Sequence, residues 1–169
     1  MIKSEIFDFV ARTQRSDERN GLLGEKTILV HCGCISQQEY ELIKHRKSVV
    51  AICPISNTFL NTKMPDLNLM EELGIPWCIA TDGLGTGRSL SLIDQIEVAR
   101  KEFPDIAIEK FYTGITTNPA KIYKRQHYTG KVEEGVESKV IIADYDGSDA
   151  NELLVKLFEN KINWKTVIL

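Results

Sequence analysis

Polar side chains of types that are useful in catalysis follow three apolar runs of this 169-residue chain. Next to the runs at 27–30, 49–53 and 77–80 stand, in that order, His31, the pair Ser56 and Asn57, and Asp82. An imidazole and a carboxylate can exchange protons with a reacting group, while a hydroxyl and an amide can orient a bound molecule. If the runs are neighbouring strands, we expect these side chains to form one site.

The pattern around these residues predicts alternating strands and helices. The three runs are apolar throughout, which is typical of parallel strands covered on both faces, and ligands of such sheets bind at the carboxyl ends of the strands. Between and after them the sequence predicts helices at 36–47 and 67–73, a loop after Pro54, and a helix that Ser89 or Ser91 caps and that runs to Glu102. Further elements are expected as helices at 2–19, 106–112, 118–124 and 149–159 and strands at 139–145 and 164–169.

A second interpretation rests on the glycine-rich segment from Gly83 to Gly87, which lies between a predicted strand and a predicted helix. Such loops can hold a phosphate at a helix N-terminus, and Arg88 stands nearby. The glycine spacing matches neither the dinucleotide fingerprint nor the P-loop. The alternative function is therefore a small α/β binding module that holds an anionic ligand on this loop.

The four cysteines, at positions 32, 34, 53 and 78, are read as free thiols. Each lies in or at the end of an apolar run, and a chain without a secretory signal is expected to keep its thiols reduced. A zinc knot around His31 is the competing interpretation, but structural zinc sites commonly use two close-spaced ligand pairs and only one such pair is present. We therefore expect buried thiols on strands.

Composition limits the classes of function. With 43% hydrophobic and 27% charged residues, the sequence is typical of one globular domain, and its net charge of −3 argues against a nucleic-acid partner. No apolar run approaches the roughly 20 residues of a membrane span, and the first residues lack the apolar core of a signal peptide. We expect a cytoplasmic protein without a membrane partner.

Three segments resemble, in order and spacing, the last three barrel strands of the metal-dependent amidohydrolase superfamily: residues 29–32, 53–60 and 79–84. The closest branch holds chlorohydrolases, guanine deaminase and adenosine-type deaminases, and residues 75–92 look most like aminofutalosine deaminases of menaquinone biosynthesis. Residues 116–121 and 130–144 are similar to the family's segments after the barrel.

The resemblance implies the carboxy-terminal part of a (β/α)₈ barrel. Residues 1–125 would carry strands 6–8 with their helices, and residues 126–169 would form a small α+β tail, strand-helix-strand, from the family's composite β-sandwich. The implied activity is deamination of a purine-type substrate, aminofutalosine- or adenosine-like, by a metal-activated water.

The resemblance also assigns roles. Asp82 matches a metal ligand that carries the proton from the attacking water to the leaving amine, and His31 matches a residue that orients the substrate and polarises the group under attack. Ser56, Asn57 and Gly83 match positions that border the substrate. The metal of the complete enzyme would be zinc or iron.

Departures from the family pattern limit what this chain can do alone. It has no His-x-His pair, its other histidines are His45 and His127, and a whole barrel takes about 250 residues. It has Thr86 and Gly87 where the branch commonly has Ser-Asn, which leaves substrate specificity open. We expect the chain to be inactive by itself, and its open outer strands to favour self-association or pairing with an amino-terminal barrel half.

Overall fold

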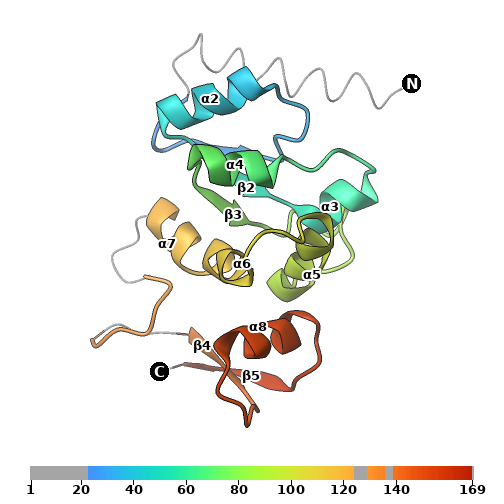
Figure 1. Ribbon diagram of the computed structural model, residues 1–169, viewed down its shortest axis with the longest axis vertical. Coiled ribbons are helices and arrows are strands. Elements are labelled where there is room, and N and C mark those ends of the chain that lie inside the picture. Colours follow the sequence, from blue (N-terminus) through green and yellow to red (C-terminus); the bar gives the residue numbers. More distant parts are fainter. Residues whose placement is uncertain (1–22, 124–128, 136–138, 169) are drawn as a thin grey trace.

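A three-stranded parallel sheet forms the centre of the molecule. The computed structural model describes residues 23–123, 129–135 and 139–168. The strands are β1 (Ile28–Val30), β2 (Val49–Ile52) and β3 (Trp77–Ile79), hydrogen-bonded in the order β1-β2-β3 (Figure 1). Their register pairs Leu29 with Val50 and Val50 with Trp77. The predicted parallel arrangement is confirmed, whereas the helix expected at 2–19 and the domain boundary expected at 125 lie outside the described residues.

Three helices connect these strands: α2 (Gln37–Arg46), α3 (Pro54–Phe59) and α4 (Leu67–Leu73). Ser36 caps α2 in a capping box with Glu39, and Gly74 ends α4 with a φ of 68°. The expectation of a loop after Pro54 is wrong, because α3 starts there. Proline suits the first turn of a helix, where its fixed φ is already helical and no N–H is needed.

The chain after β3 is helical and then forms a second sheet. It continues through α5 (Leu92–Glu102), α6 (Ile108–Ile115), α7 (Thr117–Tyr123), β4 (Lys139–Ala143), α8 (Ala150–Phe158) and β5 (Trp164–Ile168), with β4 and β5 antiparallel. Of the two serines considered, Ser91 caps α5, since its hydroxyl accepts a hydrogen bond from the Asp94 amide at 3.3 Å. Figure 1 shows α8 lying between the helices α5 and α6 and the second sheet.

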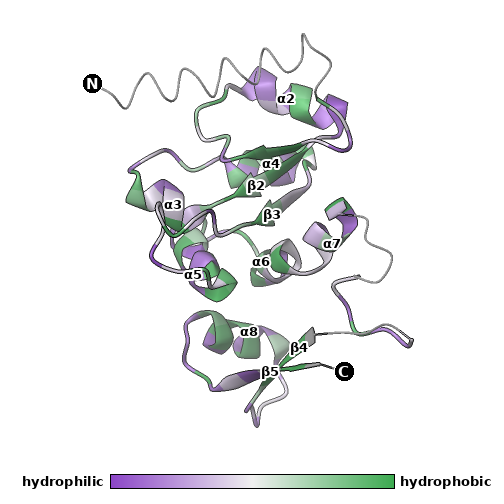
Figure 2. Ribbon diagram, turned by 180° about the vertical axis from the view of Figure 1, so that it is seen from behind, coloured by the Kyte–Doolittle hydropathy of each residue, from purple (hydrophilic) through white to green (hydrophobic). Residues whose placement is uncertain are grey.

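One continuous core joins the parallel sheet to the helices. Alternate strand residues contribute to it and share one face of the sheet: Leu29, Val50, Ile52, Trp77 and Ile79. Fully buried Phe158 of α8 belongs to the same cluster, so the carboxy-terminal segment packs on the first sheet's helices. The hydrophobic colouring of β2 and β3 in Figure 2 reflects this burial. Among the described helices, none is long and apolar enough to cross a membrane.

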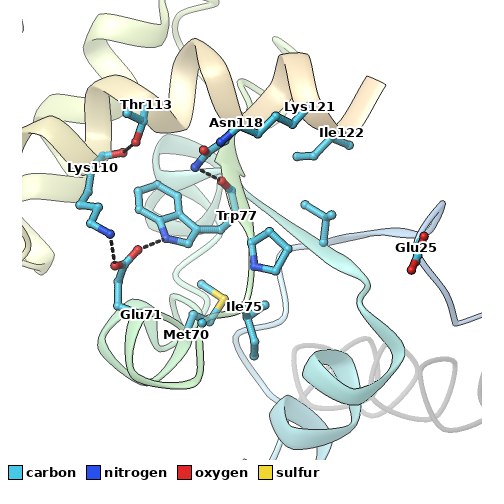
Figure 3. A pocket seen from close by; sticks show the side chains of 13 residues that line it. Glu25, Met70, Glu71, Ile75, Trp77, Lys110, Thr113, Asn118, Lys121 and Ile122 are labelled. Carbon is cyan, nitrogen blue, oxygen red and sulfur yellow. Dashed lines mark hydrogen bonds and ion pairs between the residues drawn. The ribbon is translucent and has the colours of Figure 1, made fainter. Parts of the chain in front are cut away.

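A cavity of about 440 Å³ lies at the amino ends of β2 and β3, where Trp77 is the central side chain (Figure 3). The Trp77 indole donates a hydrogen bond to Glu71 at 2.6 Å, and Lys110 forms an ion pair with the other Glu71 oxygen at 2.8 Å. Asn118 donates to the Trp77 carbonyl at 2.9 Å, and the indole packs edge-on against Phe111. These contacts hold β3 in place at the end opposite the polar strand ends.

Candidate functional site

The carboxyl ends of β1, β2 and β3 bring the polar side chains together. His31 directly follows β1, α3 begins two residues after β2 and carries Ser56 and Asn57, and Asp82 lies three residues beyond β3. Because the strands are parallel, these three ends meet at one edge of the sheet. The Nε2 atom of His31 is 3.8 Å from Oδ2 of Asp82, and each of these two side chains is 34% exposed. The cluster therefore opens to solvent.

Two hydroxyl groups hold the carboxylate of Asp82. Oδ2 accepts hydrogen bonds from Ser56 Oγ and from Thr86 Oγ1, both at 2.7 Å. These bonds, with Ser56 the larger influence, keep the pKa of Asp82 below its ordinary value of 3.8. The side chain is consequently an ionised carboxylate at neutral pH, the form that can accept a proton or bind a cation.

We predict that this carboxylate makes stability depend on pH in the acid range. A carboxyl whose pKa is lower in the folded chain adds stability above its unfolded value, near 3.8, and that contribution is lost as the pH falls through the folded value. Asp82→Asn should therefore cost more stability at pH 7 than at pH 2.5, measured by denaturant unfolding. The exposed Asp105→Asn variant is the matched control; an equal cost at both pH values for Asp82→Asn contradicts the prediction.

Asn57 fixes the orientation of the imidazole. Its Nδ2 donates to the Lys63 carbonyl at 2.9 Å, so its Oδ1 is the atom that faces His31 Nδ1 at 3.0 Å. The hydrogen-bond network thus assigns a proton to Nδ1 of His31 and turns Nε2 toward Asp82. At 3.8 Å the imidazole and the carboxylate are not directly hydrogen-bonded, and an atom of a third group can contact both.

The backbone beside the site has an unusual conformation. His31, Cys32 and Asp82 have φ values of 72°, 60° and 57°, in the left-handed region that non-glycine residues seldom adopt. The Tyr40 hydroxyl donates to the Cys32 carbonyl at 3.1 Å and holds this turn from α2. Gly33 completes it, because a Cβ at this position would overlap the Lys63 carbonyl. The turn can therefore close only with glycine at position 33.

The contacts of Thr86 and Gln95 near the site are not predicted from the sequence: Thr86 donates to Asp82, and Gln95 accepts from the Ile55 amide of α3. The sequence marks Thr86 only as a departure from the family's Ser-Asn pattern and as a hydroxyl four residues after Asp82 in a glycine-rich turn, and it carries no signal for Gln95. Gly83, a predicted substrate residue, lies exposed in this turn, and its carbonyl accepts the Thr86 amide at 3.0 Å. The part of Gly83 in binding a substrate stays a prediction.

The cysteines are free thiols, as expected, but not all are buried on strands. Cys34 is exposed in the loop after β1, and Cys32 and Cys53 are buried just outside strands, which leaves Cys78 as the one within a described strand. Burial raises the pKa of Cys53 to about 12 and that of Cys78 to about 11. These two thiols stay protonated at neutral pH, which disfavours metal binding because the thiolate is the ligand form.

The side chains of the site do not amount to a complete metal centre. In the described part of the chain, no group of three or more His, Cys, Asp and Glu residues could hold a metal ion. Asp82 and His31 are one carboxylate and one imidazole, whereas catalytic zinc sites commonly use three protein ligands. His45 is exposed on α2, and His127 lies outside the described residues. The residues present therefore fit only part of such a centre.

Comparison with known proteins places the chain in a family. The sequence matches the amidohydrolase family over residues 3–168. The chain belongs to the amidohydrolase family. The resemblance seen in the sequence is thus confirmed at this level. The chain spans 24–34% of the length of the curated relatives it matches first, so it corresponds to between a quarter and a third of an amidohydrolase.

Several of the matching relatives and solved structures are deaminases, and others are an atrazine chlorohydrolase and a triazine hydrolase. A 5'-deoxyadenosine deaminase of Methanopyrus kandleri is 28% identical over 130 residues, which cover 73% of this chain and 30% of the relative. Aminofutalosine deaminase of Helicobacter pylori, in complex with methylthio-coformycin, superposes with a TM-score of 0.68 at 25% identity. The match covers 79% of this chain and 34% of the deaminase chain. A zinc-bound adenosine deaminase of Xanthomonas campestris superposes with a TM-score of 0.73 at 20% identity, and the match covers 83% of this chain and 34% of the deaminase. The mixed α/β fold of this chain therefore matches about one third of the length of each of these two enzymes.

Proposed function

We propose that this chain is the carboxy-terminal part of a hydrolytic deaminase that acts on a purine-type nucleoside. In this proposal β1, β2 and β3 are the last three strands of a (β/α)₈ barrel, residues 1–125 form the barrel part, and residues 126–169 form the tail. The observation that carries it is the approach of His31 to within 3.8 Å of Asp82 at the carboxyl ends of parallel strands. The names of its relatives supply the substrate class.

The proposed chemistry uses the ionised state of Asp82. A water oxygen bonds to the carbon that bears the amino group, and Asp82 takes a proton from this water. The same proton then passes to the amine, the carbon–nitrogen bond breaks, and ammonia leaves. His31, held by Asn57, faces the position where the attacked group would lie and orients it, while Ser56, Asn57 and Gly83 border the substrate.

The divalent metal of the complete enzyme, zinc or iron, needs ligands beyond those of the described residues, and Asp82 would supply one of them. A second polypeptide can provide the others. β1 and β3 are the outer strands of the described sheet, and each lacks a neighbour on one side among the described elements. Backbone groups at such edges pair readily with another strand. We therefore propose that the chain assembles with an amino-terminal barrel half, or with a second copy.

Complementation tests the proposed function. An amino-terminal barrel half with a His-x-His pair is sought in the DNA that neighbours the coding sequence of this chain. Ammonia release from 5'-deoxyadenosine, 5-methylthioadenosine and aminodeoxyfutalosine is then measured for the chain alone and for the chain co-expressed with that half. We expect turnover and stoichiometric metal in the co-expressed assembly alone. Turnover with stoichiometric metal in the isolated chain would refute the complementation, and a metal-loaded assembly without turnover would refute the deaminase.

The alternative of an anion-binding module has little support from the geometry of its loop. The segment from Gly83 to Gly87 begins beside the carboxylate of Asp82, which would repel an anion. The Thr86 amide is hydrogen-bonded to the Gly83 carbonyl at 3.0 Å, so one amide that could hold a phosphate is already used within the turn.

A further inference from the structure

Gln95 is a polar side chain in the middle of the core. It lies on α5, is completely buried, and its Oε1 accepts a hydrogen bond from the Ile55 amide at 2.9 Å. Its Nε2 has no hydrogen-bond partner within the described structure. Burying an amide group whose NH₂ has no hydrogen-bond partner lowers the stability of the fold. The bond from the Ile55 amide is therefore the interaction that explains a glutamine at this position.

That bond supplies a helix cap from a distant part of the chain. The first amides of a helix have no acceptor within the helix and need a partner from outside. Cys53, at the N-cap of α3, provides no side-chain hydrogen bond, and Pro54 has no N–H. Ile55 therefore carries the first N–H of α3, and Gln95, 40 residues away in sequence, accepts it.

The two residues directly after Ile55 are the ones that organise the site. Ser56 is fully buried and its hydroxyl holds Asp82, while Asn57 is 1% exposed and its Oδ1 orients His31. Both side chains project from the first turn of a six-residue helix. A small rotation of α3 would move both hydrogen bonds together.

We propose that Gln95 is a positioning residue, which anchors the first turn of α3 so that Ser56 and Asn57 reach Asp82 and His31. The geometric part of this proposal stands on the contacts of the folded chain. Its importance for catalysis rests on the proposed function. Amide exchange and the tautomer of His31 test the positioning role of Gln95 without metal and without turnover. The positioning role can therefore fail while the deaminase proposal stands, or the reverse.

Amide exchange in the unmodified chain is the first test. The Ile55 amide should exchange at least about tenfold more slowly than the exposed amides, because a buried hydrogen bond protects it although it lies in the first helical turn. The measurement is hydrogen–deuterium exchange followed by NMR on the full chain. Exchange of the Ile55 amide at the rate of an exposed loop amide would overturn the proposal without any variant having to fold.

The variant Gln95→Met separates positioning from bulk packing. Methionine nearly fills the same volume and removes both the bond to Ile55 and the unsatisfied Nε2, so the two effects on unfolding oppose each other. We expect the Ile55 amide to exchange about tenfold faster, while the denaturant midpoint changes little. Gln38→Met, the same substitution on the exposed face of α2, is the matched control and should change neither.

The NMR chemical shifts of the two imidazole nitrogens of His31 report its tautomer. A substitution that affected only the packing of α5 would leave them unchanged. At pH 8 the unmodified chain should show a protonated Nδ1, as the bond to Asn57 requires. Gln95→Met should shift the signals toward a mixture of the two neutral tautomers, and Gln38→Met should not. Faster exchange of Ile55 with an unchanged His31 tautomer would refute the positioning role.

Discussion

Replacing Asp82 by asparagine is expected to lower the turnover of the proposed deaminase assembly by about 10²–10⁴-fold, the range that a positioned proton-transfer group contributes. Asparagine has nearly the same shape and tolerates the left-handed backbone at this position, where φ is 57°. It can still accept a hydrogen bond from Ser56 or Thr86, but it cannot take a proton from water. Ammonia release at saturating substrate measures the effect.

Asp105→Asn is the control for this experiment, because Asp105 is exposed in the turn between α5 and α6. It should leave turnover within a factor of about two, as surface substitutions usually do. Far-ultraviolet circular dichroism of both variants checks that the assembly still folds. Full turnover of a folded Asp82→Asn assembly would remove Asp82 from the reaction and, with it, the proposed mechanism.

Replacing Trp77 by alanine is expected to lower the free energy of unfolding by about 3–5 kcal/mol. The indole is 2% exposed, packs against Phe111 with ring centres 6.1 Å apart, and donates a hydrogen bond to Glu71. Alanine would leave a cavity beside the one already present and an unpaired acceptor on Glu71. Denaturant unfolding followed by circular dichroism measures the change.

The second tryptophan provides the matched control. Trp164, on β5, is 42% exposed, and its replacement by alanine should cost clearly less. Trp77→Phe keeps most of the packing and should fall between the two. Equal costs for Trp77→Ala and Trp164→Ala would show that the amino end of β3 contributes less to stability than its contacts indicate.

The arrangement of strands and helices can be predicted because local signals agree with the long-range fold. Runs such as 49–53 are apolar throughout, as buried parallel strands require, and the Ser36–Glu39 pair is a local signature of a helix start. The prediction of a loop after Pro54 is wrong because a proline can either end a strand before a loop or begin a helix. The six residues of α3 are too few for a helical pattern to decide between the two.

The candidate site can be predicted in outline for a different reason. Parallel strands place their carboxyl ends together, so the residues after each run are expected to meet, and His31, Ser56, Asn57 and Asp82 do. The contact of Gln95 with Ile55 joins two elements 40 residues apart and has no pattern in the sequence. The proposed metal centre has no complete signature in the sequence either, because the His-x-His pair of the family pattern is not present in it.

The left-handed residues at the site have a consequence for protein engineering. Each such non-glycine conformation stores of order 1–3 kcal/mol of strain, and three of them, at His31, Cys32 and Asp82, lie within one small cluster. A screen that selects only for heat resistance can lower this strain by placing glycine at these positions, in place of the side chains that we propose take part in the reaction. Thermostable descendants of this sequence should therefore be sought by selecting for assembly and turnover together, since folding selection by itself favours an inert scaffold.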